Sequence, residues 1–334
     1  MFSSRFSGWS GLLLLLFAAL IPVGQAKASP IYNGGPVITG TPHVYYIWYG
    51  SWGADTATTI LPDLITNLSG TSYMNIATSY STGSYTVGNQ VTYSGSTFVN
   101  STTNSSIFTS NGTSLDGDAT HSGTGTIAGI VSSVLAANPS WASDSQGIFD
   151  VLTASTISVS GFNTSFCGWH YSTAWGGSTL GVQYGFIGDP VQGGGCNVAL
   201  QDAPSANGNF GADAMASVIA HELFETVTDP LGTAWWDSNS SSSTFQDENA
   251  DMCAWQFGTT FTTGTGGNAN VTLNGSNYLL QQQWLNQGGG TGRTGGACTT
   301  SLALLAPAPE PASLVLLLPA VLGLATVRWR RLSA

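Results

Sequence analysis

Residues 213–230, with the sequence DAMASVIAHELFETVTDP, contain the pattern that decides the fold. Apolar side chains recur there every four residues, which predicts a helix with one face in the core. They are Met215, Ile219, Leu223 and Val227. Asp213 is of a residue type that caps helix N-termini, and Pro230 should end the helix by Asp229 because a proline restricts the residue before it. We therefore predict one helix over this stretch, capped by Asp213.

The same predicted helix carries His221 and Glu225 on a different face. Residues four apart project side by side from a helix, so this imidazole and this carboxylate can hold one cation. Glu222 lies between them, as the glutamate does in the H-E-x-x-H motif of zinc hydrolases, where it polarises the water on the metal. The motif here is H-E-x-x-E, in which a carboxylate replaces one imidazole.

A third ligand is needed, because one histidine and one glutamate do not hold a metal ion tightly. An acidic stretch, DENAD at residues 247–251, follows about twenty residues downstream. This spacing is similar to that of the gluzincin branch of zinc peptidases, in which a later helix supplies a glutamate ligand and then an aspartate that orients the ligand histidine. Carried over to this sequence, the ligands are His221, Glu225 and Glu248, the general base is Glu222, and the residue that orients the histidine is Asp251.

The metal expected at this site is Zn²⁺. Two carboxylate ligands make a site less positive than two histidines and one glutamate do, so its pull on the proton of a bound water is weaker and harder cations such as Ca²⁺ or Mn²⁺ can compete. The alternative is a chance match in a structural helix, because short motifs of this kind occur in many sequences.

The hydrophobic pattern outside this helix predicts both strands and helices. Strands are expected at residues 44–49, at 148–159 (one or two) and at 278–284, helices at 58–68 and 126–137, and short strands and loops at 69–118. We therefore expect an α+β fold, with a single zincin-like domain at residues 29–302 that has a mixed sheet, an active-site-type helix and disulfide staples.

The first 28 residues have the features of a secretion signal. Arg5 gives a positive start, residues 11–23 form an apolar run, and residues 26–28 (AKA) match a small-residue cleavage site. The apolar run is short for a membrane span, although an uncleaved anchor is the alternative. We expect a signal peptide at residues 1–28 and a mature chain that begins near Ser29.

The C-terminal end carries a second export feature. Pro-Glu-Pro at residues 309–311 precedes an apolar stretch at 312–327 and three arginines, which should stay on the cytoplasmic side. The arginines are Arg328, Arg330 and Arg331. The arrangement resembles the PEP-CTERM sorting tail of Gram-negative bacteria. That resemblance implies a linker at residues 303–311, a sorting and transmembrane segment at 312–334, and handling by an exosortase on the way to the cell surface or the extracellular matrix. The alternative is an ordinary anchor that is never processed.

Charge is distributed very unevenly along the chain. There are 17 acidic and 6 basic residues, and the only basic residue between the two end segments is Arg293. A surface with this excess of carboxylates repels the phosphates of nucleic acids. The sequence therefore excludes DNA or RNA binding and favours cations or neutral polymers as ligands.

The four cysteines indicate two disulfides, because an even number in an exported chain is typical of a disulfide framework. Three pairings are possible, and we favour Cys167 with Cys196 and Cys253 with Cys298 since each closes a loop of moderate length. A four-cysteine metal site is the less favoured alternative, because no C-x-x-C pair is present.

The other histidines and the tryptophans are weaker candidates. His170 lies near Cys167 and could be an additional ligand, but a lone histidine near a disulfide is more often structural. No role is assigned to His43 or His121. Most of the 11 tryptophans are expected in the core, although their flat faces could also stack on sugars. A serine triad is not supported, because no G-x-S-x-G motif is present.

Four stretches of the sequence resemble the phosphate-induced protein family, to which plant EXORDIUM belongs. They are residues 35–40 (GPVITG), 44–50 (VYYIWYG), 166–171 (FCGWHY) and 213–230. The resemblance implies a secreted or cell-wall protein that is linked in plants to growth and brassinosteroid responses, with no agreed biochemical activity. Plant members often lack the histidine and glutamates of the H-E-x-x-E motif, which this chain has. A shared fold therefore does not imply a shared function.

Two functional hypotheses follow from the sequence. The first is a surface-displayed metalloprotein similar to zincin peptidases, whose substrate is a peptide or a cell-surface polymer. The second is a non-catalytic matrix or cell-wall protein that binds calcium or polysaccharide. Metal content and turnover distinguish the two.

Overall fold

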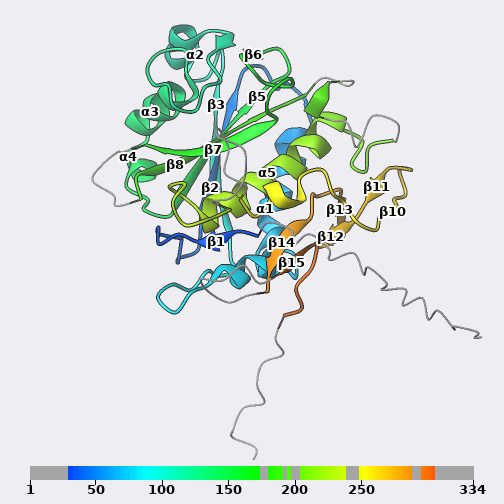
Figure 1. Cartoon of the computed structure of the whole chain (residues 1–334). Helices are drawn as coiled ribbons and strands as arrows, with labels where there is room; N and C mark the ends of the chain where they lie inside the picture. Colours follow the sequence, from blue (N-terminus) through cyan, green and yellow to red (C-terminus); the bar gives the residue numbers. More distant parts are fainter. Residues whose placement is uncertain are drawn as a thin grey trace, which may run out of the picture.

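Figure 1 shows the computed structural model of the chain, which describes residues 29–173, 180–190, 194–196, 204–237, 248–287 and 295–304. The predicted signal peptide, the Pro-Glu-Pro segment and the C-terminal apolar segment lie outside these ranges, as do Asp247 and Arg293. Within the described ranges, no helix is both long and apolar enough to cross a membrane.

A five-stranded sheet forms the centre of the fold. Its order is β3 (Thr92–Val99), β2 (His43–Tyr49), β5 (Gly147–Thr153), β8 (Val182–Gly188) and β7 (Gly168–Thr173). The first four strands are parallel, and the edge strand β7 runs antiparallel to β8. Every residue of β5 and β8 is buried, as expected for parallel strands that are covered on both faces. The predicted mixed sheet is confirmed.

Helices cover both faces of the sheet (Figure 1). On one face lie α1 (Ala57–Leu68) and α5 (Phe210–Thr228), and on the other lie α2 (Ser105–Asn111), α3 (Ile127–Ala137) and α4 (Pro139–Ala142). Side chains of β2 identify the two faces, because neighbouring residues of a strand point in opposite directions. The hydroxyl of Tyr46 donates to the carbonyl of Leu61 in α1 at 3.3 Å, whereas Tyr49 packs against Phe108 of α2.

Helix α5 is enclosed by the rest of the protein. All of its residues except Phe210 and His221 are buried. The four-residue apolar repeat is therefore only part of a helix that is buried on all sides, which explains why acidic residues of this helix also lie inside. The helix ends at Thr228, before Pro230, as predicted.

The predicted cap of α5 was wrong. Asn209 caps the helix, because its side-chain oxygen accepts a hydrogen bond from the N–H of Ala212 at 3.0 Å. Asp213 lies within the first turn, where its carboxylate accepts hydrogen bonds from the N–H and the side chain of Asn207 at 3.1 and 2.6 Å. The helix thus begins before Asp213, which instead holds the preceding loop.

Most other predicted elements are present. The predictions at residues 44–49, 58–68, 126–137 and 148–159 correspond to β2, α1, α3, and β5 with β6 (Ser158–Val159). Residues 69–118 are more regular than predicted, because they contain the 3₁₀ helix η1 (Met74–Tyr80), β3 and α2.

The strand predicted at residues 278–284 is interrupted. Strand β13 (Ser276–Tyr278) ends where the predicted strand begins, and β14 (Gln283–Asn286) starts near its end. The residues between them bond to side chains and loops instead of to a neighbouring strand, since the N–H of Leu280 donates to Oδ1 of Asn270 at 2.8 Å.

The remaining short elements form small two-stranded sheets beside the central one. They are β1 (Ile31–Tyr32) with β9 (Trp235–Trp236), β4 (Ser114–Leu115) with β6, β10 (Phe261–Thr262) with β11 (Asn268–Ala269), β12 (Val271–Leu273) with β13, and β14 with β15 (Gly296–Thr299). A 3₁₀ helix, η3 (Asp251–Cys253), precedes β10.

Two disulfides join Cys167 to Cys196 and Cys253 to Cys298, which confirms the favoured pairing. All four cysteines are therefore bonded. The first bond fixes the chain just before β7, and the second joins η3 to β15. Disulfides form in oxidising compartments, so this framework indicates an exported protein. The fold is α+β and disulfide-stapled, as the sequence predicts.

Candidate metal site between α5, β7 and η3

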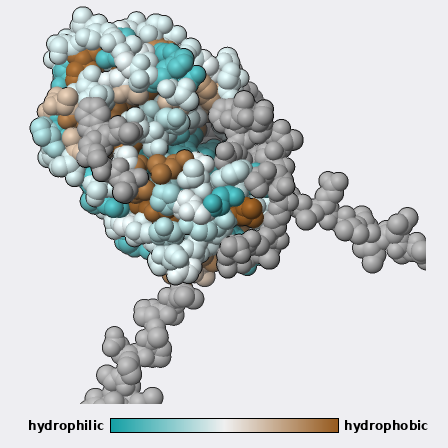
Figure 2. Space-filling view, turned by 60° about the vertical axis from the view of Figure 1, so that its left-hand side comes forward, coloured by the Kyte–Doolittle hydropathy of each residue, from teal (hydrophilic) through white to brown (hydrophobic). Residues whose placement is uncertain are grey.

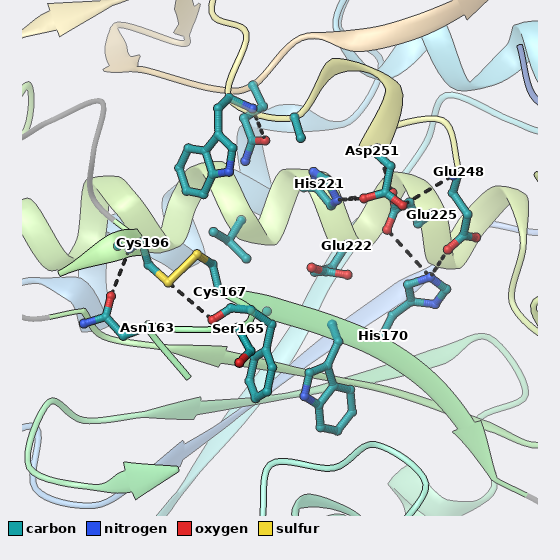
Figure 3. A pocket seen from close by; sticks show the side chains of 18 of the residues that line it. Asn163, Ser165, Cys167, His170, Cys196, His221, Glu222, Glu225, Glu248 and Asp251 are labelled. Atoms are coloured by element: carbon teal, nitrogen blue, oxygen red, sulfur yellow. Dashed lines mark hydrogen bonds and ion pairs between the residues drawn. A yellow bond between two sulfur atoms is a disulfide. The ribbon is translucent and has the colours of Figure 1, made fainter. Parts of the chain in front are cut away.

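A cavity of about 410 Å³ lies between α5, β7 and η3. Figure 3 shows its ionisable side chains pointing toward one another from three segments that are far apart in the sequence. They are His170 from β7, His221, Glu222 and Glu225 from α5, and Glu248 and Asp251 from the segment that forms η3. We call these six residues the acidic cluster.

Helix α5 and strand β7 approach closely because residue 168 is a glycine. A Cβ atom at Gly168 would lie 2.5 Å from Cγ1 of Val218 and 3.1 Å from Oε1 of Glu222. Any larger residue there would push β7 away from the helix. The small size of this residue therefore allows His170, two residues further along β7, to reach the α5 side chains.

The two motif residues of α5 meet as their spacing predicts. Nε2 of His221 lies 3.2 Å from Oε1 of Glu225, and both side chains are almost completely buried. Asp251 joins them from η3, because its Oδ1 lies 3.4 Å from the same Nε2 atom and its N–H donates to Oε1 of Glu225 at 3.0 Å. Asp251 and Glu225 therefore both lie beside Nε2 of His221, the nitrogen that would bind a metal ion.

His170 belongs to the cluster, although the sequence favoured a structural role for it. Its Nε2 atom lies 3.1 Å from Oε2 of Glu248 and 3.8 Å from Oε2 of Glu225. Its side chain is 10 % exposed. The signal in the sequence was its position in a short strand-forming stretch beside Cys167, but only the pairing of β7 with β8 places that strand opposite α5.

The described residues contain two groups of three whose possible ligand atoms all lie within 4.8 Å of one another. These groups are His170 with Glu222 and Glu225, and His221 with Glu225 and Asp251. Glu225 is common to both and so occupies the centre of the cluster. The ligand set predicted from the sequence, His221, Glu225 and Glu248, shares two members with the second group. Glu248 lies against Nε2 of His170.

Burial and mutual repulsion lead the acidic cluster to retain protons. Burial raises the pKa of Glu222 to about 8, and burial together with the charge of Glu225 raises the pKa of Glu248 well above its usual value. Burial alone would lower the pKa of His221, but Glu225 and Asp251 raise it well above 6.5. Protons thus offset the negative charge that the nearby carboxylates accumulate, as a bound cation would also do.

Two buried polar atoms of the cluster have no hydrogen-bond partner among the described residues. They are Nδ1 of His170 and Nδ1 of His221. Unpartnered buried polar atoms are costly in a folded protein unless a ligand or water satisfies them. Both imidazoles direct Nε2 toward carboxylates, which leaves Nδ1 on the far side of each ring.

The other two histidines form separate pairs with carboxylates. Nδ1 of His43 lies 2.7 Å from Oδ2 of Asp144, and Nδ1 of His121 lies 2.6 Å from Oδ2 of Asp116. Of the eight tryptophans in the described ranges, Trp48, Trp52, Trp235 and Trp284 are buried, and Trp141 and Trp169 are partly buried against the core.

Exposed aromatic rings lie beside the cavity. Trp255, 41 % exposed, lines it, and Tyr171, 40 % exposed, lines a second cavity of about 780 Å³. The two cavities adjoin, because Phe166, Trp169 and His170 line both. On the face shown in Figure 2, apolar residues form separate patches among hydrophilic ones.

Comparisons with known proteins identify one family. The family described as "Phosphate-induced protein 1 conserved region" matches residues 31–284. Two similar proteins come from Arabidopsis thaliana. Protein EXORDIUM-like 3 is 29 % identical over 280 residues, which are 76 % of this chain and 79 % of that protein, and Protein EXORDIUM-like 5 is 27 % identical over 247 residues, 68 % and 64 % of the two chains. No solved structure matches the chain.

The retained protons predict a pH-dependent stability for the metal-free protein. Glu222 has a folded-state pKa of about 8 against 4.5 for an ordinary glutamate, so folding is favoured at low pH and this contribution is lost as pH rises from about 5 to 8. The Glu222→Gln variant should lose less stability over that range than the wild type, by roughly 1–4 kcal/mol at about 1.4 kcal/mol per pKa unit. Urea unfolding in the presence of EDTA measures this difference.

The control for this comparison is Thr272→Ala, which removes an exposed side chain that has no titratable group. This variant should follow the wild-type profile. Parallel profiles for the wild type and Glu222→Gln between pH 5 and 8 would show that Glu222 is ionised at neutral pH.

Proposed function

Because the chain belongs to the phosphate-induced protein 1 family, which includes the EXORDIUM-like proteins, we propose that it is an exported member of that family that binds one divalent cation in the acidic cluster. The observation that carries the proposal is the convergence of two imidazoles and four carboxylates on one cavity. The described residues contain no lysine or arginine that could neutralise these carboxylates. A cation is therefore the ligand that fits the site best.

The donor set favours zinc over calcium. His170 and His221 both direct Nε2 toward Glu225, so His170 supplies the second imidazole that the H-E-x-x-E motif lacks. Imidazole suits Zn²⁺ and related transition metals, whereas Ca²⁺ takes oxygen ligands. Glu225 would be the carboxylate ligand, with Glu248 or Asp251 completing the set.

We further propose that the site is hydrolytic, in the manner of zincin peptidases. A cation bound there would act as a Lewis acid and lower the pKa of water. Glu222 is buried, belongs to one of the two groups of possible ligands, and lines the cavity. Its carboxylate would accept a proton from water and deliver it to the leaving amine of a peptide.

A non-catalytic role is the second candidate, and membership of the EXORDIUM-like family favours it. In that case the cluster would be structural or hold calcium, and Tyr171 and Trp255 would stack on the sugar rings of a matrix or cell-wall polysaccharide. Display on the surface of a Gram-negative cell, with an exosortase as the sorting partner, is part of both proposals.

The first test is metal content. Purified protein reconstituted with excess Zn²⁺ and then desalted should retain about one equivalent, measured by mass spectrometry of the elements. His221→Ala and Glu225→Gln should each weaken zinc binding by more than about 100-fold, because losses of 10- to 100-fold are typical even for residues that only support a ligand.

The matched control is His121→Ala, which removes a histidine that is also paired with a carboxylate but lies outside the cluster. This variant should bind zinc as the wild type does. A folded wild-type protein that retains no zinc, or that retains calcium alone, would refute the zinc proposal.

The second test is turnover. With zinc bound, Glu222→Gln should keep the metal and lower the cleavage rate of a casein-type substrate by about 10²–10⁴-fold, because general-base catalysis contributes about that factor. Hydrolysis that is absent from the zinc-loaded wild type, or equal in Glu222→Gln, would leave the non-catalytic role as the better account.

A further inference from the structure

A carboxylic acid lies buried in the middle of the central sheet, at Asp150 of β5. It is 6 % exposed, and its neighbours in the strand, Phe149 and Val151, are apolar. Strands of this kind are normally apolar throughout, and an unpaired buried acid costs stability. Packing alone therefore does not explain an acid at this position.

Asp150 lies in the same row of the sheet as His170. Asp150 pairs with Gly185 of β8, and Gly185 pairs with His170 of β7. Residues in one row point to the same face, and Tyr46, which pairs with Asp150 on its other side, points to the face that α1 and α5 cover. The side chains of Asp150 and His170 therefore both lie on the α5 face, separated by one strand.

Gly185 leaves the space between them open. A Cβ atom at Gly185 would lie 2.8 Å from Oδ1 of Asp150, so the carboxylate leans over the glycine toward β7. Strands two apart in a sheet are separated by about 9–10 Å. No direct hydrogen bond or ion pair joins the two side chains, but over a glycine the space between them can hold one bridging water molecule.

Both side chains have unsatisfied hydrogen-bonding capacity on this side. Nδ1 of His170 is buried without a partner among the described residues, and Asp150 makes no side-chain hydrogen bond with them. Burial raises the pKa of Asp150 to about 7, and the nearby charge of His170 opposes that rise. The opposite nitrogen of His170, Nε2, faces Glu248 and Glu225.

We propose that Asp150 is a positioning residue for His170. Its carboxylate accepts a hydrogen bond from Nδ1–H of the imidazole through one water molecule and thereby keeps the Nε2 lone pair directed into the acidic cluster. This inference rests on the proposed metal site. Carboxylates behind metal-binding histidines fix the ring orientation and raise its basicity in this way, and their loss costs about 10- to 100-fold in metal affinity.

The test uses two substitutions of Asp150 in the full chain. Asp150→Asn keeps the shape and a weaker acceptor, whereas Asp150→Val removes the acceptor and suits a buried strand, so at least one variant should fold. Zinc affinity, measured by competition with a chromophoric chelator, should fall by about 10-fold for Asp150→Asn and up to about 100-fold for Asp150→Val. In NMR spectra of the zinc-loaded variants, the Nδ1–H resonance of His170 should be shifted from its wild-type position or absent.

Two further variants show whether Asp150 acts through His170. In a His170→Ala background, Asp150→Val should have no additional effect on zinc affinity. If Asp150 acts only through His170, the effects of the two substitutions are not additive. Tyr46→Phe, which alters the neighbour of Asp150 on the other side, should leave zinc affinity unchanged.

The outcomes separate the two proposals. Wild-type protein that does not bind zinc would overturn both. Zinc binding that is equally tight in the wild type, Asp150→Asn and Asp150→Val, with the His170 resonance unchanged, would overturn only the role of Asp150. Equal losses from Asp150→Val with and without His170 would show that Asp150 contributes to packing alone.

Discussion

The burial of several carboxylates beside only two imidazoles is the constraint on which the rest of this structure depends. Like charges a few ångströms apart in a poorly solvated cavity repel strongly, and no lysine or arginine among the described residues reduces that repulsion. Protons relieve it in the metal-free protein, as the raised pKa values of Glu222 and Glu248 indicate. A divalent cation would relieve it more completely. A divalent cation bound in the acidic cluster would therefore stabilise the folded protein.

The architecture serves to bring the cluster together. Helix α5 is held between the sheet and the C-terminal part of the chain, so its acidic residues cannot turn out to solvent. Strand β7 directly follows the disulfide-bonded Cys167, and helix η3 contains the disulfide-bonded Cys253. The two bonds therefore fix the segments that carry His170 and Asp251. The residues of the site that do not belong to α5 are therefore carried by segments that disulfide bonds hold in place.

The sequence predicts the residues that act through local spacing. His221 and Glu225 meet because they are four apart on a helix, and the end of that helix follows from Pro230. Strand β2 and helices α1 and α3 follow from hydrophobic periodicity, and the disulfide pairing from loop length.

What could not be predicted depends on contacts between distant segments. His170 becomes part of the site only because β7 pairs antiparallel with β8 at the edge of the sheet, and no local pattern encodes that position. The cap of α5 is Asn209 instead of the predicted Asp213, whose carboxylate accepts a hydrogen bond from Asn207 of the preceding loop. Asp150 is a single acid in an otherwise apolar stretch of strand, and only the register of three strands relates it to His170.

The central claim is that both imidazoles and at least one carboxylate of the acidic cluster bind the same ion. X-ray absorption spectroscopy of the zinc-loaded protein tests this most directly. The account predicts a first shell of nitrogen and oxygen atoms at about 2.0–2.2 Å with the scattering of two imidazole rings. A shell of oxygen atoms alone, or a spectrum identical to that of zinc in buffer, would contradict it.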